Sequence, residues 1–244
     1  FEVVLELFQF SRADDAGSCS SANHAILRCV EAGTIKNVSF MACGPAIEEA
    51  ARMFRGRDDI AMGLHVCLNA EWEDVKWGPL LESRFLTDEN GSFWPTPAQT
   101  KENGWTTEAV LDEIAAQREK LRELGLKISY ADEHMGVSWI GFRDDLARFC
   151  AEEGLFDAAK VPSLPSAANL EAQLRAANGE RCVWINHPGL DAPDMQNFNL
   201  PGQPKGVVAR ERAAETEFLC GEEIHEIFRQ WRVETVRYDE ISSD

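Results

Sequence analysis

Five polar side chains occur where predicted strands end, and their types suit a hydrolytic centre. Asp14 and Asp15 follow an apolar run rich in Val, Leu and Phe, and His65, His134 and His187 lie at or near the ends of three later strands. The carboxyl ends of parallel strands lie on one face of a sheet or barrel, so these residues are expected to converge. A lone Asp-Asp pair more often forms a solvated turn, and it is the recurrence at several strand ends that favours a shared site.

An Asp-His-His set gives a divalent metal three protein ligands and leaves positions open for water and substrate. Mixed imidazole and carboxylate ligation suits Zn²⁺, Mn²⁺, Fe²⁺ or Co²⁺, and Mg²⁺ less comfortably. Neighbouring strand residues point in different directions, so the second Asp can take a proton from the attacking water while a further His protonates a leaving amine. These groups suffice to hydrolyse an amide. His24 and His225 fall inside predicted helices, and we expect both to be structural.

Strands and helices alternate along the chain, which predicts parallel strands joined by right-handed crossovers in one domain, residues 1–244. The Asp pair and Gly17 are expected to form a loop corner after the first strand. The expected strands are 1–10, 37–41, 60–68, 127–131, 156–161, 181–185 and 233–238. The expected helices are 21–32, 45–54, 107–124, 141–153, 167–177 and 209–231, the last broken near Gly221.

An insertion at about 69–104 interrupts this alternation and is rich in Pro, Gly, Trp and Phe. Two roles are open for it. Its aromatic residues can tie a long loop to the barrel surface. Alternatively, the segment is a lid or wall beside the active site, with a Trp that stacks on a sugar.

Composition limits the possible partners and the compartment. The net charge of −18 over 244 residues argues against nucleic acid and against an anionic membrane, but not against a neutral sugar or a metal. No apolar run approaches the roughly 20 residues of a membrane span. The first run lacks a preceding basic region, which favours a strand over a signal peptide, although the sequence begins with Phe and not Met. Seven scattered Cys without Cys-x-x-Cys spacing predict reduced thiols and a cytoplasmic protein.

Four short motifs occur in a characteristic order. They are Ala13-Asp14-Asp15-x-Gly17, Gly63-Leu64-His65-x-x-Leu68, Asp132-x-His134 and His187-Pro188-Gly189. In these motifs the chain resembles the YdjC-like carbohydrate deacetylases, which include chito-oligosaccharide deacetylases. The segment Arg212–Leu219 is also similar to the Arg-x-x-Glu helix that closes that family's fold.

The resemblance implies a single-domain α/β fold, a distorted TIM-like (β/α) barrel related to polysaccharide deacetylases. It also implies one divalent metal ion, often Mg²⁺ or Zn²⁺, and removal of an N-acetyl group from an amino sugar. By position, Asp15, His65 and His134 correspond to the metal ligands, Asp14 to the general base and His187 to the acid; the roles of Asp14 and Asp15 could be exchanged. A small carbohydrate substrate and a homodimer are implied as well.

The chain departs from the family pattern around the third proposed ligand. The pattern His-x-Asp-x-His-x-His has Tyr130 and Gly136 in place of its outer histidines, Glu133 replaces a small residue, and Lys160 replaces an Arg. We expect these changes to reshape the substrate pocket. Two other functions therefore stay open: a metal-dependent amidohydrolase for a non-sugar amide, and a non-catalytic sugar-binding protein on the same fold.

Overall fold

A curled parallel sheet of seven strands forms the centre of the molecule, for which the computed structural model describes residues 7–241. The strand order is β5-β4-β3-β2-β1-β6, β7 pairs with the first residues of β1, and every ladder is parallel. The strands are β1 (Leu7–Ala16), β2 (Asn37–Phe40), β3 (Ala61–Val66), β4 (Ile128–Glu133), β5 (Phe156–Asp157), β6 (Val183–Asn186) and β7 (Val233–Thr235).

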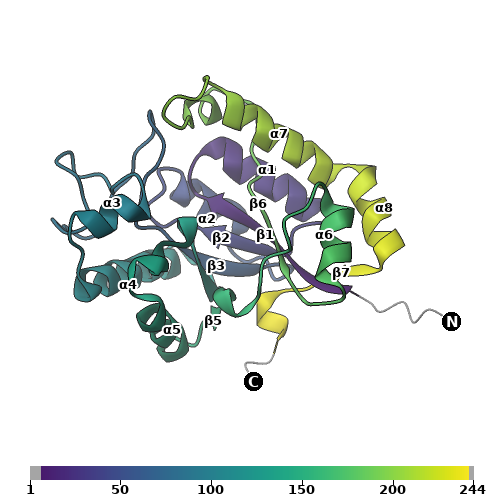
Figure 1. Cartoon of the computed structure of the whole chain (residues 1–244), viewed down its shortest axis with the longest axis horizontal. Helices are drawn as coiled ribbons and strands as arrows, with labels where there is room; N and C mark the ends of the chain where they lie inside the picture. Colours follow the sequence, from purple (N-terminus) through teal and green to yellow (C-terminus); the bar gives the residue numbers. More distant parts are fainter. Residues whose placement is uncertain (1–6, 242–244) are drawn as a thin grey trace.

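Helices cover the outside of this sheet, with α1, α7 and α8 on one side and α4 and α5 on the other (Figure 1). The predicted break near Gly221 is confirmed, because α7 ends at Cys220 and α8 begins at Glu222. The α-helices are α1 (Ser20–Glu31), α2 (Ile47–Phe54), α3 (Pro97–Glu102), α4 (Thr107–Glu123), α5 (Arg143–Glu152), α6 (Leu170–Ala177), α7 (Val207–Cys220) and α8 (Glu222–Trp231). Short 3₁₀ helices are η1 (His134–Ile140), η2 (Ala158–Lys160), η3 (Met195–Asn197) and η4 (Tyr238–Glu240).

The sheet curls into an incomplete barrel. Its edge strands, β5 and β6, are not paired with each other. The segment after β5 crosses the gap instead: Ser163 forms an isolated parallel bridge with Val183, whose backbone N–H donates to the carbonyl of Pro162 over 2.8 Å. The expected α/β barrel class is confirmed. The barrel is distorted where β5 and β6, its two edge strands, fail to pair.

Aromatic rings fill the barrel near the amino ends of the strands. The Tyr238 ring stacks on Phe10 with 4.4 Å between ring centroids, and its centroid lies 4.5 Å from that of Tyr130 and 5.3 Å from that of Phe156. Tyr238 and Phe10 are fully buried. These rings leave the carboxyl ends of the strands as the side on which polar groups can face a cavity.

The first strand is longer than predicted and contains both acidic residues. Residues 1–6 of the expected strand lie outside the described part of the chain, and β1 runs through Asp14 and Asp15 to Ala16. The expectation that the Asp pair lies in the loop was therefore wrong, whereas Gly17 does form the turn between β1 and α1. Strands disfavour Asp in general, but β1 lies between β2 and β6, and the β1–β2 register shifts between Ala13 and Ala16. Asp15 has a φ of +66° in this irregular part of the strand, so its side chain departs from the regular alternation.

Other boundaries also moved. Strand β4 continues to Glu133, which brings the strand to the residue before His134. Strand β5 is only two residues long, because the Asp157 carboxylate accepts the backbone N–H of Ala159 and caps the turn η2. The last predicted strand shortens to β7, and the expected helix starts at 45, 141, 167 and 209 each shift by two or three residues.

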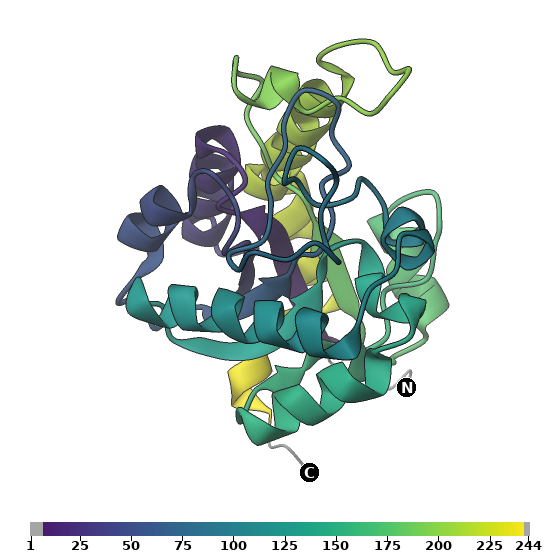
Figure 2. The ribbon, with the colours of Figure 1, turned by 90° about the vertical axis from the view of Figure 1, so that its left-hand side faces the viewer.

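The insertion packs onto the barrel through its aromatic residues. Trp72, Trp77, Leu86 and Phe93 are buried, and the Trp77 indole donates to the carbonyl of Asn69 over 2.8 Å. Figure 2 shows these loops beside the segment that precedes α7. The anchoring role is therefore confirmed, and Trp72 also serves as a wall because it lines the cavity described below.

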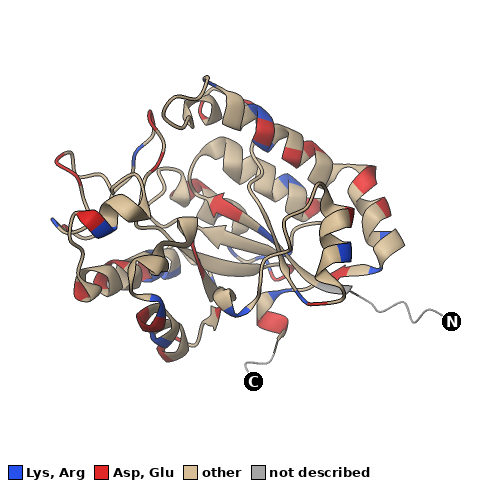
Figure 3. Cartoon of the chain, viewed as in Figure 1, with Lys and Arg blue, Asp and Glu red and all other residues tan. Residues whose placement is uncertain are grey.

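Charge is spread over the outer helices and loops, with acidic positions in the majority and red also at the carboxyl end of β1 (Figure 3). None of the helices within residues 7–241 combines the length and apolarity needed to cross a bilayer.

Candidate metal centre and active site

Three of the predicted site residues meet at the carboxyl end of the barrel. The side-chain atom Oδ1 of Asp15 lies 3.5 Å from Nε2 of His65 and 3.3 Å from Nδ1 of His134, and these two nitrogens are 3.3 Å apart. The three residues come from β1, β3 and the first residue of η1, and all are buried. Distant parts of the chain thus supply a triangle of one oxygen and two nitrogens.

The spacing of this triangle fits a metal ion. Ligands about 2.0–2.1 Å from a tetrahedral zinc are separated from one another by roughly 3.4 Å. Oδ1 of Asp15 is buried and no hydrogen bond of normal geometry reaches it from the described residues. A buried carboxylate oxygen without a partner is costly, and a cation between the three atoms would remove that cost.

His65 is held in the tautomer that a ligand needs. Its Nδ1–H donates to Oδ1 of Asp132 over 3.0 Å, because a carboxylate can only accept, and Nε2 then presents its lone pair toward Asp15. Asp132 is itself fixed through its other oxygen, which accepts from Ser39 Oγ at 2.9 Å and lies 2.8 Å from Nε of Arg12. Sequence reasoning placed Asp132 in a motif but gave it no role.

His134 is held in the same way by a residue that sequence reasoning missed. Its Nε2–H donates to Oε2 of Glu71 over 2.9 Å, which leaves Nδ1 for the triangle. Glu71 is 8% exposed and follows β3 by five residues. No motif marks it, since a Glu at the start of a long insertion has the appearance of a solvated residue; its burial depends on how the insertion folds back.

The electrostatics of the two histidines favour a cation. Burial opposes charge on His65, but the carboxylates of Asp132 and Asp14 outweigh it and hold the His65 pKa well above its usual value. Burial also opposes charge on His134 and would lower its pKa, but the Glu71 carboxylate outweighs this effect and raises the His134 pKa above the usual range. A divalent ion competes with protons for these nitrogens, and the same negative surroundings stabilise it.

Asp14 lies beside the triangle but is engaged differently. Nε of Arg12 donates to its Oδ1 over 2.6 Å, and Nη2 of Arg12 donates to its Oδ2 over 2.9 Å. Burial would raise the Asp14 pKa, but the Arg12 guanidinium lowers it below its ordinary value, so the side chain is ionised. Asp14 lines the cavity and can face a substrate.

A second group of potential ligand atoms comprises Asp14, His65 and Asp132. Arg12 contacts both carboxylates of that group, and Asp132 also accepts from His65. Because the guanidinium neutralises these acids, this group forms an ion-pair network that supports the first triangle. The contrast favours Asp15 over Asp14 as the ligand of a metal.

Asp15 is also oriented by α7. Nη2 of Arg212 donates to Oδ2 of Asp15 over 2.7 Å, while Oδ1 faces the histidines. Burial raises the pKa of this carboxyl group, but Arg212 and the two histidines more than reverse the effect and hold it well below its usual value. Arg212 was noted in the sequence only as part of a helix motif.

His187 follows β6 and lines the same cavity, half-buried. Its backbone N–H donates to Oε2 of Glu215 over 2.9 Å, which fixes the start of the turn that carries the imidazole. Burial raises the Glu215 pKa, although His187 and Arg212 act in the opposite direction. His24 and His225, predicted to be structural, lie in α1 and α8, away from the cavity lining.

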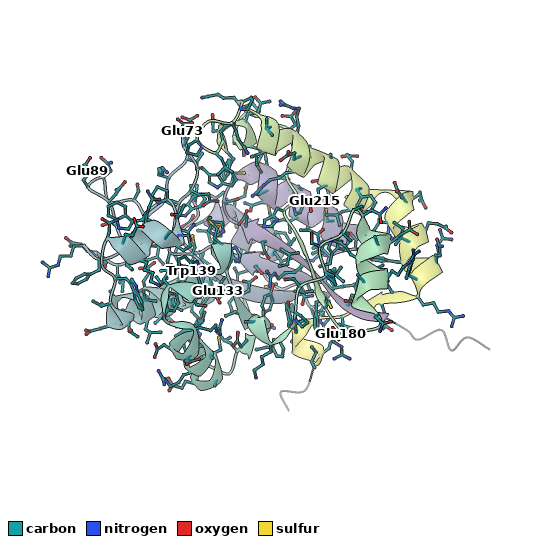
Figure 4. The ribbon with its side chains drawn as sticks, viewed as in Figure 1. Glu73, Glu89, Glu133, Trp139, Glu180 and Glu215 are labelled. Carbon is teal, nitrogen blue, oxygen red and sulfur yellow. The ribbon has the colours of Figure 1, made fainter. Side chains whose placement is uncertain are left out.

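The cavity has a volume of about 740 Å³, enough for a short oligosaccharide. Figure 4 shows Glu133 on the β4 side of this region and Glu215 on α7 across from it. Its lining combines the polar residues above with apolar walls from the insertion, η1, β6, the segment before α7 and α7 itself, namely Trp72, Met135, Ile185, Leu200 and Val208.

The departures from the family pattern have unequal effects. Gly136 and Glu133 line the cavity, so they do shape it. Tyr130 is fully buried and donates its hydroxyl hydrogen to Ser39 over 2.8 Å, below the site, and Lys160 is exposed in η2. Neither of these two lines the cavity.

Comparison with known proteins agrees with this geometry. The family described as YdjC-like protein matches residues 12–177, about two-thirds of the chain. The chain belongs to the YdjC-like family. The match includes the three residues of the triangle and Asp14, while His187, Arg212 and Glu215 lie beyond it.

Curated relatives of this YdjC-like protein include a "carbohydrate deacetylase" of Vibrio cholerae, 31% identical over 122 residues that cover 50% of this chain and 46% of the relative. A "chitooligosaccharide deacetylase" of Escherichia fergusonii is 26% identical over 177 residues, 72% of this chain and 68% of that protein. In the alignments with the Vibrio cholerae proteins, the chain spans about half the length of the curated relatives it matches.

A solved structure extends the likeness over the whole fold. The crystal structure of a "putative cellobiose-phosphate cleavage protein" from Enterococcus faecalis superposes with a TM-score of 0.77 at 19% identity, and the match covers 97% of this chain and 99% of that one. At this identity the match supports the barrel fold of residues 7–241 and leaves the reaction to be argued from the site.

Proposed function

We propose that the protein is a metal-dependent hydrolase that removes an N-acetyl group from an amino sugar or a short oligosaccharide of amino sugars. The observation that carries the proposal is the buried triangle of Asp15 Oδ1, His65 Nε2 and His134 Nδ1 at the base of a sugar-sized cavity. The names of the curated relatives, carbohydrate deacetylase and chitooligosaccharide deacetylase, support the same reaction.

Asp15, His65 and His134 would hold one divalent cation, with Zn²⁺ or Mg²⁺ the favoured ions. Such an ion supplies Lewis acidity for a carbonyl and lowers the pKa of water. The chain's own part is to keep both imidazoles in the ligand tautomer through Asp132 and Glu71, which the hydrogen bonds described above accomplish.

Asp14 acts as the general base in this proposal. Its carboxylate accepts a proton from the attacking water, whose oxygen adds to the acetyl carbon, and Arg12 keeps Asp14 ionised and oriented. Exchanged roles are disfavoured because both oxygens of Asp14 are already occupied by Arg12, whereas Oδ1 of Asp15 is free.

His187 acts as the general acid. As the bond between the acetyl carbon and the nitrogen breaks, the imidazole gives its proton to the amine, so that acetate and a free amino sugar leave. Glu215 accepts the backbone N–H of His187 and lines the cavity beside it. This hydrogen bond fixes the main chain at His187 and thereby helps to position the imidazole ring.

Acetate release tests the proposal directly. Purified protein, with its metal content measured, is incubated with N-acetylglucosamine, N,N′-diacetylchitobiose, triacetylchitotriose and acetamide-type small amides. Release of acetate from the sugars, with small amides hydrolysed far more slowly, is the expected result. Hydrolysis of the small amides alone would show that the substrate is a non-sugar amide and not an amino sugar. A protein that binds sugars without metal or turnover would defeat the proposal.

A further inference from the structure

The imidazole of His187 is held differently from the two histidines of the triangle. His65 and His134 are each fixed by a carboxylate that accepts from one ring nitrogen. Within residues 7–241, no hydrogen bond reaches either ring nitrogen of His187, whose bonded group is its backbone N–H. The direction of this ring therefore depends on the backbone that carries it.

The turn that carries His187 is bound to α7 through each N–H group it has. The turn is His187-Pro188-Gly189, and a proline has no N–H to offer. Oε2 of Glu215 accepts from His187 over 2.9 Å, and Oγ1 of Thr216 accepts from Gly189 over 3.0 Å. Pro188 and Gly189 are buried. Two consecutive residues of one helix thus hold both N–H groups of the turn.

The hydroxyl of Thr216 makes further contacts at this junction. Thr216 is fully buried, and its Oγ1 lies 2.9 Å from the carbonyl oxygen of Gly189 and 2.8 Å from that of Arg212. The hydroxyl has one hydrogen, which these two carbonyls share. A bond to the carbonyl four residues back is usual for Thr in a helix, but Gly189 is 27 positions away. The hydroxyl thereby joins the turn to the backbone of Arg212, whose side chain orients Asp15.

Gly189 allows the turn to lie close against α7. A Cβ on Gly189 would lie 3.0 Å from Cβ of Arg212 and 2.7 Å from Cε of Met195, and the N–H of Gly189 also donates to the Arg212 carbonyl over 3.3 Å. Thr216 bridges this narrow gap with a short β-branched side chain, which is stiff at χ1. Close packing and the shared hydroxyl therefore fix the far end of the turn, while Glu215 fixes its beginning.

We propose that Thr216 is a positioning residue for general acid catalysis, because its hydroxyl keeps the His187 imidazole aimed at the nitrogen that leaves. This inference rests on the proposed function. In that reaction the bond between the acetyl carbon and the nitrogen breaks while a proton passes from His187 to the nitrogen, so the ring must lie within hydrogen-bond reach of that atom. A misplacement of about 1 Å can cost roughly 10²-fold in rate.

A leaving group that needs no proton separates this role from a general loss of structure. N,N′-Diacetylchitobiose releases an amine, which must be protonated. In 4-nitrophenyl acetate the C–O bond breaks instead, and nitrophenolate takes the electron pair and leaves without a proton. We expect Thr216→Val to lower kcat for the sugar about 10- to 100-fold and kcat for the ester less than about twofold. Thr216→Ser keeps the hydroxyl and should restore most of the sugar activity.

Thr34→Val is the matched control. Thr34 is also fully buried, and its hydroxyl contacts the carbonyls of Cys29 and Leu219, so it ties the end of α7 to α1 without touching the turn. Both Val variants remove one buried hydroxyl and should lower the thermal unfolding temperature by similar amounts. We expect the ratio of sugar turnover to ester turnover to change in Thr216→Val and to stay at its wild-type value in Thr34→Val.

The ring signals of His187 give a readout that does not depend on turnover. The chain has five His, and comparison with the His187→Gln protein identifies the His187 signals in a proton–nitrogen NMR spectrum. Thr216→Val should move or broaden these signals, because the ring is no longer held in one direction. Thr34→Val should leave them in place. These signals decide the outcome if the ester is not turned over.

Three results would overturn the inference. They are an equal loss of sugar and ester turnover in Thr216→Val, the same change of ratio in Thr34→Val, and His187 signals that Thr216→Val leaves unchanged. A wild-type protein that releases no acetate, but whose His187 signals move in Thr216→Val and not in Thr34→Val, would instead uphold the positioning of the ring and defeat the proposed reaction.

Discussion

Glu71 accepts a hydrogen bond from His134 through the ring nitrogen that faces away from Asp15, with 2.9 Å between Oε2 and Nε2. The ring nitrogen that remains, Nδ1, lies 3.3 Å from Oδ1 of Asp15. One side chain of the insertion thus determines which nitrogen of a proposed ligand is available, and this relationship makes the first prediction.

Replacing Glu71 by Ala should lower metal affinity about 10- to 100-fold, as loss of such a partner of a ligating His does elsewhere. Glu71→Gln should fall between, because its amide oxygen can still accept from Nε2–H without the charge. Competition with a chromophoric chelator measures the affinities. Glu73→Ala, at an exposed position two residues further along the insertion, is the control, and equal affinities of the two Ala variants would contradict the assignment.

Asp14→Asn and Asp15→Asn should have opposite effects. The Asp14→Asn protein should keep its metal and lose about 10²- to 10⁴-fold in kcat, the usual worth of a general base. The Asp15→Asn protein should lose metal, because the carboxylate oxygen that faces the histidines is replaced in part by an amide. Metal analysis of both variants, beside acetate-release rates, decides the question, and the reverse pattern would show that the two roles are exchanged.

Metal binding should stabilise the fold. An ion that binds only the folded state adds about 2.7 kcal/mol when its concentration is 100 times Kd. Thermal unfolding of chelator-treated protein should therefore shift to higher temperature when Zn²⁺ or Mg²⁺ is restored. The same addition should leave the His65→Ala protein unchanged. A shift of equal size in both proteins would place the ion elsewhere in the molecule.

Gly63→Ala should reduce both stability and metal affinity. A Cβ at Gly63 would lie 2.2 Å from the ring of Tyr130, which is fully buried and bonded to Ser39. Overpacking of this kind costs about 1–3 kcal/mol or more, and a shifted Tyr130 disturbs the Ser39–Asp132 contact behind His65.

Gly33→Ala provides the comparison for that variant. Gly33 has a φ of +82° and open space around its Cβ position, so the substitution should cost about 1 kcal/mol in backbone strain alone and leave metal affinity intact. Denaturant unfolding and chelator competition separate the two effects. Equal metal affinities in the two Ala proteins would rule out the coupling through Tyr130.

Glu113 gives a prediction for pH away from the site. Burial raises its pKa, although its carboxylate accepts hydrogen bonds from Gln117 and the backbone of Leu80 and Leu81. An acid with a raised folded-state pKa stabilises the protein fully below its unfolded pKa and loses that contribution as the pH rises through the folded value. The stability advantage of wild type over Glu113→Gln should therefore be larger near pH 4 than at pH 7 in denaturant unfolding, and a larger advantage at pH 7 would contradict the direction of the shift.

The sequence predicted the order of the barrel elements because strand and helix periodicities are local properties. It also predicted the convergence of Asp15, His65 and His134, since parallel strands bring their carboxyl ends together. It did not predict that Asp14 and Asp15 lie within β1, because whether an acid interrupts a strand depends on the neighbours of that strand and on the basic groups that compensate its charge.

The residues that hold the site in place were harder to predict from the sequence than the site residues themselves. Glu71 and Arg212 contact His134 and Asp15 across 63 and 197 positions of sequence. Such pairs form only when the insertion and α7 pack over the barrel, and no local pattern encodes that. Arg12, which precedes Asp14 by two residues, is the exception: residues two apart in a strand share a face, so this pair could have been recognised.

The neighbours of β1 have a consequence for how the molecule is assembled. The earliest strand of the described chain lies against β2, but its remaining partners are β6 and β7, from residues 183–186 and 233–235. During synthesis the strand that carries both aspartates must therefore wait, with one edge unpaired, until residues 183–186 and 233–235 have left the ribosome. A fragment released before that point would retain Asp15, His65 and His134 without the segments that border their barrel.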